Sequence, residues 1–366
     1  MRRRRARLAA AAAVAFVAGA VIGAGDGEQR RPASHAAAQR PQERAHAAVE
    51  RLTLEQQVGH MVILRFAGTR APGYVRRALR EGRAAGVILF ADNIVSPAQL
   101  RELTRALAAP IVCVDQEGGD IRNLPWTGPE RAAPDQAAAA SVRADAAAAG
   151  RELRSAGVSV TLAPVADVPS VDGAALARRA FSSDPDTAAR AVNDAIRGWH
   201  HAGVATTVKH FPGLGGATVN TDDGPATIRR SRKELEADLA PFRAAIAAGT
   251  EFVMAGHATY PALDGLHIAS QSPAVVDGLL RRNLGFDGVV MTDSLEAAAV
   301  QAVGGVETAA VASAQAGVDV MLTTGRGSYI RVFRALLARA KADRAFRARV
   351  RTAAARVLAA QSSLHG

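Results

Sequence analysis

Charged side chains that could carry out acid–base chemistry follow several short apolar runs of this sequence. The set comprises carboxylates, a Lys–His pair, an arginine and a second histidine, at Asp115, Glu117, Asp167, Arg179, Lys209, His210, Asp222, Asp223, His257 and Asp293. Two facing carboxyl groups with cationic neighbours suit the cleavage of an acetal. One can attack or stabilise an oxocarbenium-like carbon while the other protonates the leaving oxygen.

Two other reactions fit part of this set. Lys209 ends an apolar run and could form a Schiff base with a carbonyl substrate, as a lyase would. A metal-dependent hydrolase is disfavoured because His210 and His257 have no clear third ligand at metal spacing. The single cysteine, Cys113, excludes an internal disulfide and a multi-cysteine metal site. We therefore predict neither a metal nor a cofactor.

Eight apolar runs of strand length must position these side chains, at 61–66, 86–90, 110–114, 158–162, 204–208, 252–255, 288–291 and 318–322. Several are apolar on both faces, as buried parallel strands are. Segments with helical spacing separate them, including 97–108, 188–202, 233–248 and 306–316. We predict an α/β fold, a (β/α)8 TIM barrel with a single catalytic domain, whose site lies at the carboxyl ends of the strands. A doubly wound open sheet is the alternative, but no run is followed by a G-x-G-x-x-G turn.

The chain ends differ from this body in composition. Residues 1–25 combine an arginine cluster with an uncharged apolar run, which predicts a signal peptide or an N-terminal anchor. Residues 26–45 predict a flexible linker, which leaves 46–366 for the barrel domain. No cysteine follows the apolar run, so we expect a secreted or envelope-associated protein without a lipid anchor. Residues 328–361 predict one long amphipathic helix with a solvated charged face.

The net charge of +11 also lies at the two ends. Residues 1–50 hold 9 basic and 4 acidic residues, and residues 331–366 hold 9 and 1, which leaves 27 basic and 29 acidic residues between them. A nearly neutral body does not support a nucleic-acid groove. The basic ends could associate with an anionic cell wall or membrane surface. The sequence does not define the oligomeric state, and a monomer is our expectation.

Ordered motifs at the strand ends resemble glycoside hydrolase family 3, in its single-domain β-N-acetylhexosaminidase type and an actinobacterial-like secreted form. The resemblance runs from about Leu52 to about Gly325 and rests on the segments 114–119 (VDQEGG), 162–167 (LAPVAD), 179–185 (RAFSSDP), 208–215 (VKHFPGLG), 254–257 (MAGH) and 285–293 (GFDGVVMTD). Enzymes of this type trim N-acetylglucosamine during cell-wall recycling. The resemblance implies a carbohydrate substrate and the same barrel.

The resemblance also implies roles for individual residues. Asp293 stands at the position of the nucleophile, although from the sequence alone it could instead cap a following helix. Lys209 and His210 match a pair that binds sugar hydroxyls, and could otherwise form a salt bridge at the barrel mouth. The other substrate-binding positions are Asp115, Arg179 and His257. Of these, we expect His257, like Asp167, to orient the neighbouring groups.

The general acid departs from the family pattern. The family's hexosaminidases carry an Asp-x-His pair after the fifth strand, whereas this chain has Asn220, Thr221 and Asp222 there and no histidine between His210 and His257. A carboxylic acid can protonate a leaving oxygen if burial or a negative neighbour raises its pKa. We therefore predict Asp222 as the acid/base, with Asp223 or Glu117 as alternatives. The competing interpretation is a solvated turn.

A second departure concerns substrate binding. The family has an arginine four residues beyond the second glycine of the 114–119 segment, where this chain has Asn123, with Arg122 one position earlier. We expect Arg122 to supply the same guanidinium; otherwise the pocket, and with it the preferred sugar, differs from the family's.

Together with the family resemblance, these features predict a cofactor-independent retaining hydrolase that acts through a covalent glycosyl-Asp293 intermediate. The resemblance alone implies that its substrate is terminal β-linked N-acetylglucosamine on peptidoglycan glycans. Retention needs two carboxyl groups about 5–5.5 Å apart once substrate is bound. The alternatives are a glycan-binding protein of the same fold that has lost efficient catalysis, and a family 3 glycosidase with another sugar preference.

Overall fold

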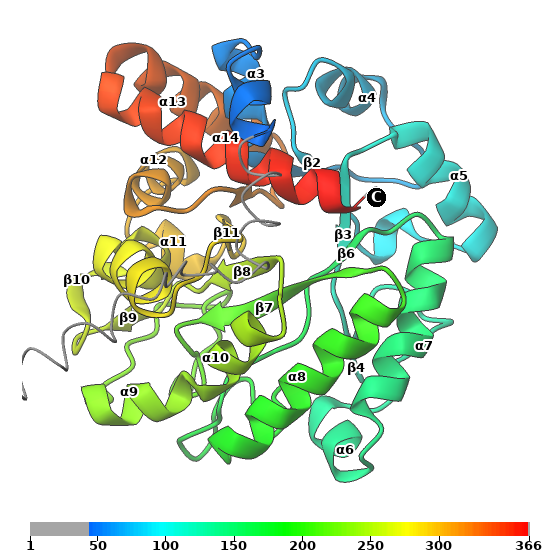
Figure 1. Ribbon diagram of the computed structural model, residues 1–366, viewed down its shortest axis with the longest axis vertical. Coiled ribbons are helices and arrows are strands. Elements are labelled where there is room, and N and C mark those ends of the chain that lie inside the picture. Colours follow the sequence, from blue (N-terminus) through cyan, green and yellow to red (C-terminus); the bar gives the residue numbers. More distant parts are fainter. Residues whose placement is uncertain (1–43, 365–366) are drawn as a thin grey trace, which may run out of the picture. The chain divides into compact units, whose positions relative to one another are not determined.

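Eight parallel strands form the barrel in the computed structural model, which describes residues 44–364 (Figure 1). They are β1 (Val62–Arg65), β2 (Gly86–Ile88), β3 (Ile111–Val114), β6 (Val160–Thr161), β7 (Ala205–Phe211), β8 (Phe252–Ala255), β11 (Val289–Thr292) and β12 (Met321–Leu322). Their order is β11-β8-β7-β6-β3-β2-β1-β12, and a parallel bridge between Met291 and Val320 brings the two ends together. Each strand lies within or overlaps one of the eight predicted apolar runs, so the predicted (β/α)8 barrel is confirmed.

Alternate side chains of these strands face two separate cores, because successive residues of a strand point to opposite sides. In β1, Ile63 packs inside the barrel, whereas Val62 and Leu64 pack against the surrounding helices. The interior core also contains Ile88, Cys113 and Met254 and similar residues from the other strands. Both faces are therefore buried, which is why the runs are mainly apolar.

Helices cover the outside of the barrel (Figure 1). They are α3 (Leu54–Gly59), α4 (Gly73–Arg80), α5 (Pro97–Leu107), α6 (Ala133–Ala138), α7 (Val142–Ser155), α8 (Pro185–His201), α9 (Arg232–Asp238), α10 (Ala240–Ala247), the π-type helix η3 (Ala274–Asn283), α11 (Ala298–Gln301), α12 (Val306–Ala316), α13 (Ser328–Ala342) and α14 (Arg344–Leu364). The Ser96 hydroxyl accepts a hydrogen bond from the Gln99 N–H at 3.2 Å and so caps α5. Two short hairpins, β4 (Gln116–Gly118) with β5 (Ile121–Arg122) and β9 (Thr259–Tyr260) with β10 (Asp264–Ile268), follow β3 and β8.

Two predicted helices are each divided in two. The segment 233–248 forms α9 and α10, since Pro241 in the first turn of α10 has no N–H with which to continue a helix. The segment 328–361 breaks at Asp343, whose backbone is extended. The Asp343 carboxylate then accepts hydrogen bonds from the N–H groups of Ala345 and Phe346, at 2.8 and 3.1 Å, and caps α14.

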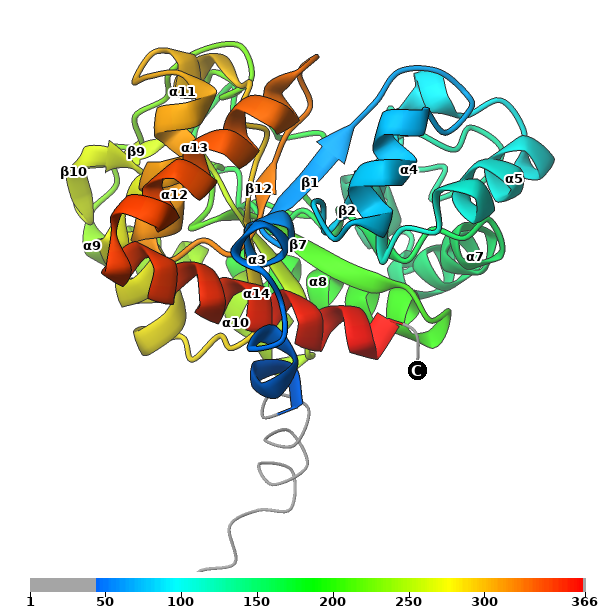
Figure 2. The same cartoon turned by 90° about the horizontal axis from the view of Figure 1, so that it is seen from above.

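The prediction of a wholly solvated charged face on this C-terminal segment is wrong for two of its arginines. Arg349 and Arg356 on α14 reach Asp319, at 2.8 and 3.3 Å, and Arg281 from η3 pairs with the same carboxylate. Asp319 is completely buried, and the three cations hold its pKa below the usual value although burial acts the other way. Because Asp319 precedes β12, α14 is fixed across the amino ends of the strands, as Figure 2 shows.

The predicted signal or anchor (1–25) lies outside the described residues, as does the linker (26–45) apart from Arg44 and Ala45, which already belong to a helical segment at 44–49. No helix among residues 44–364 is both long and apolar enough to cross a membrane.

Replacing Asp319 tests the ion cluster at the amino end of the barrel. We expect Asp319→Asn to lower the free energy of unfolding by about 3–5 kcal/mol, because it leaves the buried Arg281 and the partly buried Arg349 and Arg356 without their counter-charge. Glu307→Gln, which breaks an exposed pair with Arg331, should cost less than about 1 kcal/mol. Denaturant unfolding measures both, and equal effects would show that the Asp319 cluster does not stabilise the fold.

Candidate active site

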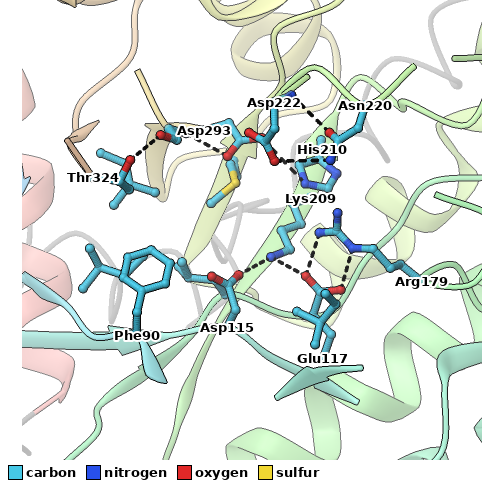
Figure 3. Close-up of a pocket in the computed structure, with 16 residues that line it drawn as sticks. Phe90, Asp115, Glu117, Arg179, Lys209, His210, Asn220, Asp222, Asp293 and Thr324 are labelled. Carbon is cyan, nitrogen blue, oxygen red and sulfur yellow. Dashed lines mark hydrogen bonds and ion pairs between the residues drawn. The ribbon is translucent and has the colours of Figure 1, made fainter. Parts of the chain in front are cut away.

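A cavity of about 350 Å³ opens at the carboxyl ends of the strands (Figure 3). Its lining contains both predicted catalytic carboxylates and most of the predicted binding residues. The lining residues are Ile88, Phe90, Asp115, Glu117, Ile121, Leu162, Arg179, Lys209, His210, Asn220, Asp222, Met254, Asp293, Ser294, Leu322 and Thr324. Asp293 after β11 therefore shares one pocket with the Lys209–His210 pair of β7, as the barrel requires.

An ion network forms one wall of the pocket. The Lys209 ammonium lies 2.6 Å from Asp115 Oδ1 and 2.6 Å from Glu117 Oε1, and Arg179 donates two hydrogen bonds of 2.8 Å to the Glu117 carboxylate. Lys209 and Glu117 are buried, whereas Asp115 and Arg179 are about one-fifth exposed, at 20% and 21%. These exposed edges leave Asp115 and Arg179 free to meet a ligand.

The network fixes the charge state of its members. Burial opposes ionisation of Glu117, but Lys209 and Arg179 outweigh it and lower its pKa to about 2. Glu117 therefore holds no proton to donate, which removes it as an alternative acid. Burial likewise disfavours the charged form of Lys209, but Asp115 and Glu117 raise its pKa above the ordinary value. An ammonium group that stays protonated does not suit Schiff-base formation, which needs the neutral amine.

His210 is oriented by a buried carboxylate. Its Nδ1 lies 2.8 Å from Asp167 Oδ2, while Asp167 Oδ1 accepts from the N–H groups of His210 and Leu214 at 3.2 and 2.6 Å. The other ring nitrogen, Nε2, faces the pocket and lies 3.8 Å from Asp293 Oδ2. Asp167 thus has the orienting role expected from the sequence.

Asp293 is held as an ionised carboxylate at the end of β11. Its N–H donates to the Ala255 carbonyl at 3.0 Å, and its Oδ1 accepts from the Ser294 N–H at 2.7 Å. Burial alone would raise its pKa, but His210, His257 and the Ser294 N–H hold the pKa below the usual range. The alternative role as a helix cap is wrong, because α11 begins later, after Ala297.

Asp222 lies next to Asp293 at the pocket mouth (Figure 3). The residue belongs to an exposed turn in which its N–H donates to Asn220 Oδ1 at 3.2 Å, so the turn chemistry expected from the sequence is present. Its carboxyl group nevertheless lines the cavity. Partial burial there, followed by the negative charge of Asp293, raises the pKa of Asp222. Asp223 does not line this cavity.

Two predicted binding residues lie outside the pocket wall. His257 is fully buried: its Nε2 lies 3.0 Å from the Ser294 carbonyl, to which it donates, and its Nδ1 lies 2.8 Å from the Ser270 hydroxyl. Burial lowers the pKa of His257, and the hydrogen bond to the Ser294 carbonyl holds the segment after Asp293 in place.

Arg122 also points away. Its guanidinium donates to the carbonyls of Gly119 and Thr127, at 2.9 and 3.4 Å, while the preceding Ile121 lines the pocket. Neighbouring residues of the short strand β5 face opposite sides, which explains why Ile121 lines the pocket and Arg122 does not. The structure therefore does not bring Arg122 together with the other binding residues, and Arg179 supplies the guanidinium in the lining.

Sequence reasoning missed several lining residues. Phe90 and Thr324 follow β2 and β12, so the rule that selects residues after strands could have found them. The Ser294 hydroxyl lies 2.6 Å from the Thr324 hydroxyl, and both contact Glu296 Oε2, at 3.1 and 2.9 Å. Among residues 44–364, no group of three or more His, Cys, Asp or Glu side chains is arranged to hold a metal ion.

Comparison with known proteins identifies the family. Residues 53–360 match the model of the glycosyl hydrolase family 3 N-terminal domain. The chain belongs to glycoside hydrolase family 3. A β-hexosaminidase of Stenotrophomonas maltophilia (strain K279a) is 37% identical over 278 residues, which cover 72% of this chain and 82% of the relative.

Solved structures agree with this assignment to glycoside hydrolase family 3. A family 3 β-N-acetylglucosaminidase of Paenibacillus sp. str. FPU-7 superposes with a TM-score of 0.82 at 34% identity, over 86% of this chain and 63% of that longer one. A β-N-acetylhexosaminidase of Beutenbergia cavernae DSM 12333 gives a TM-score of 0.76 at 35% identity, over 85% of this chain and 99% of that one.

For substrate binding, we predict different effects of replacing Arg179 and Arg122. Arg179→Ala should lower kcat/KM for a chromogenic β-hexosaminide by about 10²-fold, because it removes a charged donor from the pocket and loosens Glu117. Arg122→Ala should change kcat/KM by less than about 3-fold, since its guanidinium donates to two carbonyls of its own loop and does not line the pocket. Steady-state kinetics of both purified variants decide between them; a larger loss for Arg122→Ala would contradict the assignment.

Proposed function

We propose that this protein is a retaining β-N-acetylhexosaminidase in which Asp293 is the nucleophile and Asp222 is the general acid/base. The observation that carries the proposal is the pair of carboxyl groups in one pocket whose pKa values are shifted in opposite directions, down for Asp293 and up for Asp222. Such divergence is how two carboxyl groups acquire the separate roles of nucleophile and acid.

In the first step the terminal sugar lies in the pocket, with its hydroxyl groups bound by Asp115, Arg179 and the Lys209–His210 pair. Asp293 attacks the anomeric carbon while protonated Asp222 gives its proton to the leaving oxygen. The glycosidic C–O bond breaks, a C–O bond to Asp293 forms, and the aglycone leaves as an alcohol.

In the second step Asp222 acts as a base. It takes a proton from water, the resulting hydroxide attacks the anomeric carbon, and the ester to Asp293 breaks. The electrostatics support this change of role. Esterified Asp293 carries no negative charge, so the repulsion that helps keep Asp222 protonated disappears and its pKa falls. The water attacks from the face that the aglycone has left, so the anomeric configuration is retained.

The proposed substrate is a terminal β-linked N-acetylglucosamine on peptidoglycan fragments. The β-hexosaminidase and β-N-acetylglucosaminidase names of the relatives support the sugar. The arginine-rich and apolar start of the chain supports a secreted or envelope-associated location near that polymer. The basic ends would help to retain the enzyme on anionic wall polymers.

A glycan-binding protein without catalysis is the second candidate, because the histidine of the family's Asp-x-His pair is replaced and Arg122 points away from the pocket. Calorimetric titration with N-acetylglucosamine, run beside a hydrolysis assay on a β-N-acetylglucosaminide, separates the two. Binding without turnover would select the second candidate and overturn the enzymatic proposal.

Covalent labelling tests the nucleophile. After incubation with a 2-deoxy-2-fluoro glycosyl donor that carries an activated leaving group, we expect one added glycosyl mass on the peptide that contains Asp293. The fluorine slows hydrolysis of the intermediate, so the ester accumulates for mass spectrometry. Asp293→Asn should prevent labelling, whereas a label on another peptide would refute the assignment.

Leaving-group dependence tests the acid. Asp222→Asn should lower kcat/KM by about 10²–10⁴-fold for a glycoside with a poor leaving group, and far less for a dinitrophenyl glycoside, which needs no protonation. For the wild type, kcat/KM should fall as pH rises through the raised pKa of Asp222 and fall again as pH drops through the lowered pKa of Asp293.

Asp222→Asn should also lose the fall in kcat/KM at high pH, because an amide does not titrate. Asp223→Asn is the matched control: it removes the neighbouring carboxyl outside the pocket lining and should leave both profiles unchanged. Equal losses on both leaving groups would show that Asp222 is not the acid.

A further inference from the structure

The turn that carries Asp222 is held by the same segment that carries Asp293. The turn closes on itself through a hydrogen bond of 2.9 Å from the Asp223 N–H to the Asn220 carbonyl. Two main-chain donors from the start of α11 then reach it. The Ala298 N–H donates to the Asp222 carbonyl and the Ala299 N–H to the Thr221 carbonyl, each at 3.1 Å. We name these two hydrogen bonds the latch.

The latch uses donors that a helix always leaves available. The first N–H groups of a helix have no intrahelical acceptor, so they bond to a cap, to water or to another part of the chain. In α11 the residue before the helix, Ala297, has no side chain that could cap them. The carbonyl groups of Thr221 and Asp222 take this place, which ties the turn to α11.

The segment behind the latch is itself rigidly placed. The Leu295 N–H donates to the Leu322 carbonyl of β12 at 3.1 Å, and the buried ring of His257 holds the Ser294 carbonyl. Asp293, the latch donors and β12 thus form one connected unit. A displacement of Asp222 relative to Asp293 would have to break the latch.

Thr221 adds an apolar contribution to the latch. Its side chain is completely buried, and its hydroxyl oxygen has no hydrogen-bond partner among residues 44–364. The side chain therefore fixes the turn by filling space rather than through a specific polar contact. Beyond the turn, the Ile228 N–H donates to the Thr259 carbonyl at 2.9 Å, so the loop is also fixed to the β9–β10 hairpin.

We propose that the Ala298 and Ala299 N–H groups position the general acid, so that Asp222 stands over the pocket before substrate arrives. This inference rests on the proposed function, because it assigns the latch a purpose only if Asp222 protonates the leaving group. Ala298 and Ala299 touch no reacting atom and are positioning residues. The pair of carboxyl groups is thereby held at a set separation by the backbone, without reliance on closure of a mobile loop.

Ala298→Pro removes one latch donor and should leave the helix intact. Ala298 is the first residue of α11, where proline is well tolerated, and the extended backbone of Ala297 (ψ 140°) suits a residue before proline. Arg344→Pro is the matched control. It places proline at the first position of α14 after the extended Asp343, at an exposed residue on the opposite end of the barrel.

We expect Ala298→Pro to lower kcat/KM for a poor leaving group by about 10²-fold and for a dinitrophenyl glycoside by much less, since only the first needs a positioned acid. The alkaline fall of the pH profile should move to lower pH, because a displaced Asp222 loses its partial burial and its proximity to Asp293. Arg344→Pro should match the wild type in both respects. Equal losses on both glycosides, or an unchanged leaving-group dependence and pH profile, would overturn the proposal.

Hydrogen exchange of the substrate-free protein tests the latch independently of turnover. In the wild type the Ala298 and Ala299 amides should exchange slowly, and in Ala298→Pro the Asp223 and Ala299 amides should exchange faster than in Arg344→Pro. Rapid exchange of Ala299 in an active wild type would refute the latch alone. A protein with protected amides but no hydrolysis of either glycoside would refute the proposed function instead.

Discussion

A buried ammonium group organises this active site. Lys209 lies at the carboxyl end of β7 with almost no access to water, a position that is unfavourable for a charge unless anionic partners surround it. Asp115 and Glu117 supply that compensation from the segment after β3, and Glu117 in turn binds Arg179. The network around this buried charge therefore joins strand β7 to two loops, the segment after β3 and the connection that carries Arg179, at the same wall of the pocket. The charges of the wall cancel, and Asp115 and Arg179 keep an exposed edge for a ligand.

The other side of the pocket carries the negative charge of Asp293. His210, His257 and the Ser294 N–H favour the ionised form of this carboxyl group, and the Lys209 ammonium is already paired with Asp115 and Glu117. A second carboxyl group at the same mouth therefore has a reason to remain protonated, which is the state a general acid needs. A histidine that acts as the acid is oriented by a partner carboxylate. Asp222 needs only partial burial and a negative neighbour to stay protonated. The substitution of carboxyl for imidazole is thus chemically consistent with the rest of the site.

The local sequence was sufficient to predict the strands but not the directions of individual side chains. The eight strands were predictable because parallel strands buried on both faces are mainly apolar. The polar residues at their carboxyl ends, such as Lys209 and Asp293, had to meet at one end of the barrel. Arg122 was not predictable, since its direction depends on the register of a two-residue strand in a short hairpin. The place of the Asp222 carboxyl was a hypothesis based on position alone. Its confinement depends on hydrogen bonds from Ala298 and Ala299, which lie far along the chain and have featureless side chains. The breaks at Leu239 and Asp343 were missed because helical periodicity continues through them.

The two ends of the barrel show the same electrostatic device with different consequences. At the amino end, completely buried Asp319 is bound by Arg281, Arg349 and Arg356, and this cluster fixes η3 and α14 to the last strand. At the carboxyl end, buried Glu117 is bound by Lys209 and Arg179, but the cluster extends to the edge of a cavity. A buried carboxylate with several cations stabilises structure wherever ligand access is absent. Where one flank of the cluster faces an open pocket, the same ions present ordered donors and acceptors to a polar ligand without the reorganisation that free side chains would require. The position of the cluster relative to the strand ends, rather than its composition, thus distinguishes a structural role from a binding role in this fold.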